Sequence, residues 1–128
     1  MSAKLLYKLL AVVMLASMVL SACGGSNKSA FPTGKFMKEG SDNYGLILNE
    51  DGTFSVFSGP YTQVRATFSV EGNVFTETSN DSGCETNVAF NYTFDGSKLT
   101  FTYAGDPSAD KCDGRRADFN NVTYILSK

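Results

Sequence analysis

Hydrophobic and polar residues alternate along several short segments of the chain. The clearest case is 63–70, where every second residue is apolar: Val64, Ala66, Phe68 and Val70. Segments 87–94 and 98–103 repeat this pattern with aromatic side chains on the apolar positions. Successive side chains of a strand point to opposite faces, so each segment is predicted to be a β-strand with one buried and one solvated face. No segment after residue 32 shows the spacing of an amphipathic helix.

The pattern predicts an all-β domain of eight strands. Asp-Gly or Glu-Gly turns, which favour tight hairpins, connect the second strand to the third, the fourth to the fifth and the sixth to the seventh, and the other connections are longer. This alternation indicates an antiparallel up-and-down order, which removes its edges by closing into an eight-stranded barrel. A two-sheet β-sandwich is the alternative. The predicted strands are Gly34–Lys38, Tyr44–Asn49, Thr53–Ser58, Gln63–Val70, Asn73–Thr78, Asn87–Phe94, Lys98–Tyr103 and Val122–Ser127.

The segment before the predicted barrel has the organisation of an export signal. Lys4 and Lys8 precede the apolar run Leu9 to Leu20, which is shorter than the roughly 20 residues that span a bilayer. Leu20-Ser21-Ala22-Cys23 resembles the lipobox of bacterial lipoproteins. The resemblance implies that residues 1–22 are removed, that Cys23 is acylated by chains such as palmitate, and that the product is held in the cell envelope. Gly24 after the cysteine favours the outer membrane, on its periplasmic or surface face, in a two-membrane host. Residues 23–31 then form the anchor and a flexible tether, and 32–128 the folded domain.

The remaining cysteines, Cys84 and Cys112, are predicted to form a disulfide, since exported proteins fold where disulfides persist. The strand order supports this pairing independently. Cys84 lies in the connection after the fifth strand and Cys112 in the connection after the seventh, so an up-and-down barrel brings both to the same end.

The domain resembles the small lipocalin-like lipoproteins of bacteria. Gly34-Lys35-Phe36 lies where lipocalins carry a Gly-x-Trp motif on the first strand, with Phe36 in place of the Trp. The Asp-Gly turns and the paired late cysteines are similar too. The resemblance implies a monomeric, non-enzymatic barrel that binds a small hydrophobic or amphipathic molecule at its open end.

Composition narrows the classes of function. The chain has 11 Lys and Arg residues against 13 Asp and Glu residues, and loss of the signal would remove two of the basic ones. Nothing therefore supplies the basic surface that nucleic-acid binding requires. The chain contains no histidine, so Ser-His and Cys-His nucleophile arrangements are excluded. We expect neither an enzyme nor a resident cofactor.

The interior could be filled or hollow. The residues expected to point inward are bulky enough to fill an eight-stranded barrel: Leu46, Leu48, Phe54, Val56, Phe68, Phe90, Phe94, Leu99, Phe101 and Leu126. A hollow barrel would instead receive a ligand at the end carrying the longer loops. The ligand-contacting residues expected there are Tyr44, Val64, Glu77, Val88, Tyr103 and Arg115.

Glu77 is the most informative of these residues. If Phe75 points inward, Glu77 does so too, and its carboxylate then requires a partner such as Arg115 or Arg116. In the opposite register, Val74 points inward and Glu77 lies in water. The second register is favoured, because unpaired carboxylates are seldom buried.

The long connection after the seventh strand is rich in aspartates, including Asp110, Asp113 and Asp118. Such a density of carboxylates can bind Ca²⁺, but the spacing differs from an EF-hand, and a solvated disulfide loop is the preferred interpretation. Asp113 and Arg116 can form a local ion pair. A second hypothesis for function uses the loops 79–86 and 104–121 as a disulfide-braced surface that binds or inhibits an envelope or foreign protein, with a filled barrel behind it.

Overall fold

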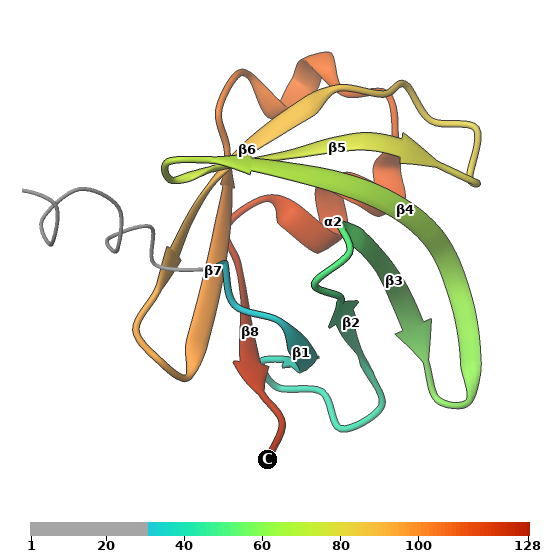
Figure 1. Cartoon of the computed structure of the whole chain (residues 1–128). Helices are drawn as coiled ribbons and strands as arrows, with labels where there is room; N and C mark the ends of the chain where they lie inside the picture. The colour runs from blue at the N-terminus through green and yellow to red at the C-terminus, as the bar shows by residue number, and fades with distance from the viewer. Residues whose placement is uncertain (1–30) are drawn as a thin grey trace, which may run out of the picture. The chain divides into compact units, whose positions relative to one another are not determined.

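The computed structural model describes residues 31–128, which form one compact unit (Figure 1). The predicted signal, the predicted acylation site Cys23 and most of the predicted tether lie outside the described residues. Eight antiparallel strands form a closed barrel in which each strand pairs with its neighbours in sequence and β1 pairs with β8. This confirms the predicted barrel and excludes the sandwich. The strands are β1 (Gly34–Lys38), β2 (Tyr44–Leu48), β3 (Thr53–Ser58), β4 (Tyr61–Glu71), β5 (Val74–Asn80), β6 (Val88–Phe94), β7 (Lys98–Tyr103) and β8 (Val122–Leu126).

The predicted turns lie where the Asp-Gly and Glu-Gly pairs indicated. In the β6–β7 turn, Asp95 Oδ1 accepts hydrogen bonds from the backbone N–H groups of Ser97 and Lys98, and Gly96 supplies a φ of 102°. This conformation is strained for residues with a Cβ, which explains the glycine. One predicted connection is wrong: only Gly59 and Pro60 separate β3 from β4, because β4 continues outward to pair with Ser58.

Gly45 allows two strands and an aromatic ring to approach closely on the outside of the barrel. A Cβ built on Gly45 would lie 2.0 Å from the backbone oxygen of Phe36 and 2.9 Å from the Phe57 ring. Phe57, which pairs with Gly45 in the β2–β3 register, covers the glycine and is only 8% exposed. An aromatic residue opposite a strand glycine restores packing that the missing side chain would otherwise lose.

Aromatic rings fill most of the barrel interior. Seven of the ten residues predicted to point inward are buried, while Phe68 and Leu126 are partly buried. Phe94 is the exception, since it lies at the β6–β7 rim and is 36% exposed. Four further large residues are fully or nearly fully buried: Phe36, Phe75, Phe119 and Tyr124.

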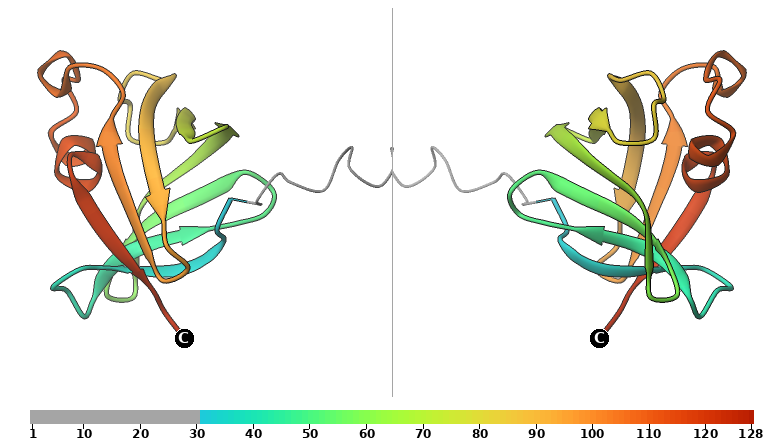
Figure 2. Two further views of the ribbon diagram at one scale, coloured as in Figure 1. Left: turned by 90° about the vertical axis from the view of Figure 1, so that its left-hand side faces the viewer. Right: turned by 90° about the vertical axis from the view of Figure 1, so that its right-hand side faces the viewer.

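A short helix, absent from the sequence prediction, packs at the end of the barrel opposite the Asp-Gly and Glu-Gly turns. The β7–β8 connection contains a 3₁₀ turn, η1 (Pro107–Ala109), and the helix α2 (Asp113–Phe119), which contacts β7 and β8 (Figure 2). The Phe119 ring lies 4.6 Å from the Phe90 ring and 4.9 Å from the Phe101 ring, measured between centroids. The last residue of α2 is therefore part of the core.

Phe31, the first described residue, packs at the end of the barrel that carries the Asp-Gly and Glu-Gly turns. The Phe31 ring lies 5.3 Å from the Phe68 ring and 4.9 Å from the Tyr92 ring, again between centroids. Phe31, which the sequence analysis assigns to the tether, thus packs against the barrel. Within residues 31–128, no helix is long and apolar enough to cross a membrane.

Candidate functional site

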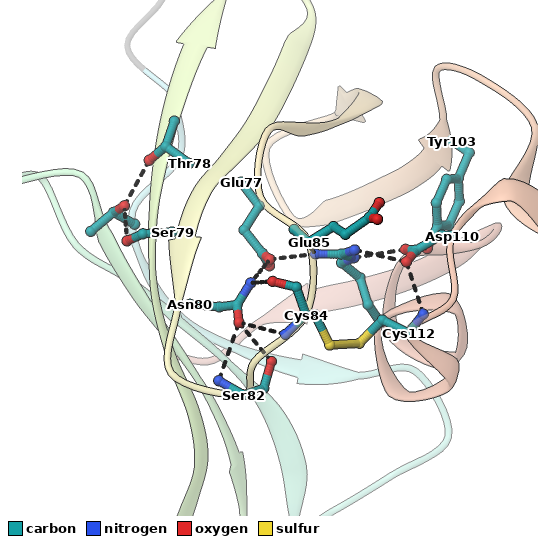
Figure 3. Close-up of polar contacts among 12 residues, drawn as sticks. Glu77, Thr78, Ser79, Asn80, Ser82, Cys84, Glu85, Tyr103, Asp110 and Cys112 are labelled. Atoms are coloured by element: carbon teal, nitrogen blue, oxygen red, sulfur yellow. Dashed lines mark hydrogen bonds and ion pairs between the residues drawn. A yellow bond between two sulfur atoms is a disulfide. The ribbon is translucent and has the colours of Figure 1, made fainter.

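The open end of the barrel carries a buried ion-pair cluster centred on Arg115. Figure 3 shows its partners Glu77, Glu85 and Asp110. Arg115 lies on α2, and its guanidinium Nε and Nη2 donate to the two carboxylate oxygens of Asp110, each over 2.7 Å. Its Nη1 donates to Glu77 Oε1 and to the backbone oxygen of Glu85, also over 2.7 Å. Arg115, Asp110 and Glu77 are 5%, 8% and 3% exposed. Planar, two-point pairing of this kind is what guanidinium groups provide and ammonium groups do not.

Glu77 is buried, so the register favoured from sequence is wrong. Phe75 on the same face of β5 is fully buried, and it pairs with the buried Phe90 of β6. Register with β6 therefore decides the facing of β5, and Glu77 follows Phe75 inward by the two-residue period of the strand. The alternative, in which Arg115 supplies the partner charge, is confirmed.

The disulfide and Asn80 hold the β5–β6 loop against this cluster. Cys84 and Cys112 are bonded, with their Cα atoms 5.8 Å apart, which confirms the predicted pair. Asn80 Nδ2 donates to Glu77 Oε1 over 2.8 Å and to the Cys84 backbone oxygen over 3.1 Å, while Asn80 Oδ1 accepts from the backbone N–H of Ser82. Cys112 immediately precedes α2, and its N–H donates to Asp110 Oδ1.

Burial and pairing shift the two carboxyl groups of the cluster in opposite directions. Hydrogen bonds from Arg115 hold the pKa of Asp110 well below its ordinary value, with further bonds from Tyr103 and the Cys112 N–H. Burial raises the pKa of Glu77, and the hydrogen bonds from Arg115 and Asn80 offset this only in part. Two carboxylates thus share one guanidinium, and Asp110 accepts two of its hydrogen bonds whereas Glu77 accepts one.

A third buried carboxyl group lies on α2, about one helical turn after Arg115. Asp118 is 7% exposed, and its Oδ1 accepts a hydrogen bond from the Tyr44 hydroxyl over 2.7 Å. The Tyr124 hydroxyl donates to the Asp118 backbone oxygen over 2.8 Å, which fixes the last turn of α2 to β8. Burial raises the pKa of Asp118 despite the hydrogen bond from Tyr44 and the charge of Lys38.

Between these groups lies a cavity of about 410 Å³, bounded by α2 and the ends of β2, β3, β4 and β5. Pockets of 300–1,000 Å³ are the usual size of small-molecule sites. Apolar side chains of the barrel core, such as Phe54 and Val56, form part of the cavity wall, and carboxyl, hydroxyl and amide groups line the rest. The lining residues are Tyr44, Phe54, Val56, Ser58, Gln63, Val64, Glu77, Ser82, Cys112, Gly114, Arg115, Asp118 and Phe119.

The structure brings together four of the six residues predicted to contact a ligand. Tyr44, Val64, Glu77 and Arg115 line the cavity. Val88 on β6 and Tyr103 on β7 do not line it. Val88 packs against the core, and the Tyr103 hydroxyl donates to Asp110 Oδ2 over 2.6 Å.

Sequence reasoning missed Asp118 and Phe119, and it assigned Asp110 and Asp118 to a solvated loop. The structure corrects this, since both aspartates are buried. The predicted ion pair between Asp113 and Arg116 is present at the surface. In the part of the chain described, no group of three or more Asp, Glu, Cys or His side chains could hold a metal ion. The one available signal was local: Arg115, Asp118 and Phe119 lie three and four residues apart, which is helical spacing.

The chain matches no known protein family, no curated protein and no solved structure. Its function is therefore inferred from the barrel, the cavity and the groups that line it.

Proposed function

We propose that the protein is a lipid-anchored, non-enzymatic lipoprotein of the bacterial envelope that binds a small hydrophobic or amphipathic ligand at the open end of its barrel. The cavity of about 410 Å³ beside α2 carries this proposal. Phe54, Val56 and Phe119 offer an apolar wall, and the carboxyl groups of Glu77 and Asp118 lie at the same cavity. A site with apolar walls and a few convergent polar groups is typical of small-molecule binding.

The ligand would occupy the mouth and not the centre of the barrel. Below the cavity the rings of Phe75, Phe90 and Phe101 are fully buried and packed on one another. Interiors packed in this way have no room for a guest molecule. The proposal therefore combines a filled lower barrel with a binding site above it, beneath the disulfide-braced loop.

The anchor is proposed from the sequence alone. Leu20-Ser21-Ala22-Cys23 directly follows an apolar run of signal-peptide length, and acylation at Cys23 would place more than one chain on the mature N-terminus. Each buried CH₂ contributes about 0.8 kcal/mol, so two or more chains give stable anchoring where one does not.

Mass spectrometry tests both parts of the proposal. The full chain is produced with its own signal in a bacterial host, extracted in mild detergent, and measured under native and denaturing conditions. We expect a denatured mass that begins at Cys23 and includes acyl chains, and a native mass with an adduct that is lost on denaturation. Cys23→Ala should abolish the acyl mass and leave the adduct. Val64→Trp, which fills the cavity, should abolish only the adduct.

Two results would count against the proposal. An unmodified N-terminus or an unprocessed signal would remove the anchor. A bare native protein, identical for the unsubstituted chain and Val64→Trp, would remove the ligand and favour the second hypothesis, in which the loops 79–86 and 104–121 bind another protein.

A further inference from the structure

Two carboxyl groups on separate elements face the same cavity. Glu77 projects from the middle of β5 and Asp118 from the last turn of α2, and both line the cavity although each is more than nine-tenths buried. They belong to different hydrogen-bond clusters. Glu77 is bound by Arg115 and Asn80, whereas Asp118 is bound by Tyr44.

Each carboxyl group has one oxygen without a donor among residues 31–128. All hydrogen bonds to the Glu77 side chain reach Oε1, and the bond to the Asp118 side chain reaches Oδ1. No buried side-chain oxygen or nitrogen within this range lacks a partner, so Glu77 Oε2 and Asp118 Oδ2 must retain contact with open space. A carboxylate accepts several hydrogen bonds, and these two oxygens are therefore available to a donor in the cavity.

The charges around the cavity do not balance. Among residues 31–128, Asp110, Glu77 and Asp118 are buried with a single buried cation, Arg115, and Asp110 takes two of its three donor nitrogens. Lys38 offsets part of the Asp118 charge from outside, where its Nζ donates to the Ala117 backbone oxygen and lies 5.4 Å from the centre of the Tyr44 ring. Burial raises the pKa of both Glu77 and Asp118. A second positive charge inside the cavity would stabilise both carboxylates.

The aromatic walls suit the same kind of ligand. Tyr44, Phe54 and Phe119 line the cavity with the carboxyl groups. Aromatic faces attract organic cations and also pack against apolar chains. An anion would meet two carboxylates, and a neutral hydrocarbon would leave their free oxygens without a donor.

We infer that the ligand of this cavity is an amphipathic organic cation, with an ammonium or guanidinium head that donates to Glu77 and Asp118 and an apolar body that packs on Phe54 and Phe119. This inference rests on the proposed function and specifies its ligand class. The head donates hydrogen bonds to Oε2 of Glu77 and Oδ2 of Asp118, and no covalent step is involved.

The test compares three probes of equal length and different charge. Hexylammonium, hexanol and hexanoate are titrated calorimetrically into the detergent-solubilised full chain at pH 7, with titrations into detergent alone subtracted. Hydrogen bonds to charged groups predict that hexylammonium binds on the order of tenfold more tightly than hexanol, with hexanoate weakest. Hexylammonium binding should also release protons, detected by repeating the titration in buffers of different ionisation enthalpy, and its affinity should fall as the pH is lowered from 7 to 4.

Matched variants assign the effect to the two carboxyl groups. Asp118→Asn and Glu77→Gln should each reduce the preference for hexylammonium over hexanol several-fold. Asp113→Asn removes an exposed carboxylate from the same helix and should leave the preference intact. Thermal unfolding of each variant without probe shows whether it has folded. If Glu77→Gln does not fold, Asp118→Asn still tests the inference.

The outcomes separate the two proposals. Equal binding of hexylammonium and hexanol, or a preference that Asp118→Asn and Glu77→Gln both leave unchanged, would overturn the cationic ligand and leave the apolar binding site. Absence of binding by all three probes would overturn the ligand site itself.

Discussion

Arg115 and Asp110 form a planar two-point ion pair in which Nε and Nη2 each lie 2.7 Å from a carboxylate oxygen. The Nη1 atom of the same guanidinium donates to Glu77 of β5. One side chain of α2 thus joins β5, the β5–β6 loop and the β7–β8 connection. The arrangement has measurable consequences for stability and its dependence on pH.

Removing the guanidinium should be costly. Arg115→Met keeps most of the side-chain volume but leaves Glu77 and Asp110 buried without their partner, which in other buried pairs destabilises the fold by about 3–5 kcal/mol. Equilibrium urea unfolding at pH 7 measures the free energy. Arg65→Ala is the control, because its ion pair with Asp81 is exposed and spans 3.9 Å. Such a pair contributes less than about 1 kcal/mol. Equal losses in the two variants would contradict the buried role of Arg115.

Acid should destabilise the protein through Asp110. Its pKa in the folded state lies below the ordinary value of 3.8, so its contribution is present above that pH and is lost as the pH falls further toward the folded-state pKa. The pKa values of Glu77 and Asp118 are raised, so these groups add stability as the pH falls toward their ordinary values. Asp110→Asn should therefore make the decline in unfolding free energy between about pH 4 and pH 2 shallower.

The exposed Asp113 provides the comparison for this acid effect. Asp113→Asn, on the first turn of α2, should retain the decline seen in the unsubstituted protein. If Asp110→Asn declines as steeply as that protein, the acid sensitivity arises elsewhere.

The disulfide should contribute strongly to the stability of this small domain. Cys84 and Cys112 are separated by 28 positions, for which the loss of unfolded-chain entropy predicts about 3.5 kcal/mol. The double variant Cys84→Ala, Cys112→Ala should lose an amount of this order in denaturant unfolding. Reductant should destabilise the unsubstituted protein similarly and leave the double variant unchanged. A reductant effect on the double variant would show that the loss does not come from this bond.

Phe119 should be the side chain through which α2 stabilises the core. It is 2% exposed, and Phe119→Ala is expected to cost about 3–5 kcal/mol, as removal of a buried ring does elsewhere. Because Phe119 also forms part of the apolar wall of the cavity, the variant should bind hexanol more weakly if it folds. Phe94→Ala, at the exposed rim, should cost less than about 1 kcal/mol in the same unfolding assay. A Phe119→Ala protein as stable as Phe94→Ala would remove α2 from the core.

The strands could be predicted from sequence because alternation and turn residues act locally. Val64, Ala66 and Phe68 specify a face without reference to any other element, and Asp95 and Gly96 specify a turn through their own hydrogen bonds and φ. Closure into a barrel followed from the alternation of short and long connections, even though β3 and β4 proved to have a tight connection.

The site was only half predictable because it depends on tertiary pairing. α2 has seven residues, fewer than an isolated helix needs, and it is stabilised by Arg115, Phe119 and the disulfide, none of which produces an apolar stripe. Glu77 was assigned to water because the facing of β5 comes from its pairing with Phe90 of β6. Asp118 accepts a hydrogen bond from Tyr44, which lies 74 positions away in the sequence. Local sequence pattern carries no information over such a separation.

α2 is secured at both ends, and this bears on how fast a ligand would exchange. Cys112 ties its start to the β5–β6 loop, and Tyr124 holds the Asp118 backbone at its end. A helix restrained in this way cannot swing away as a lid. The conformational entropy of this wall of the cavity is therefore already lost in the free protein. Association should therefore proceed in a single step at a rate set by diffusion and orientation, and differences in affinity among ligands should appear in their residence times.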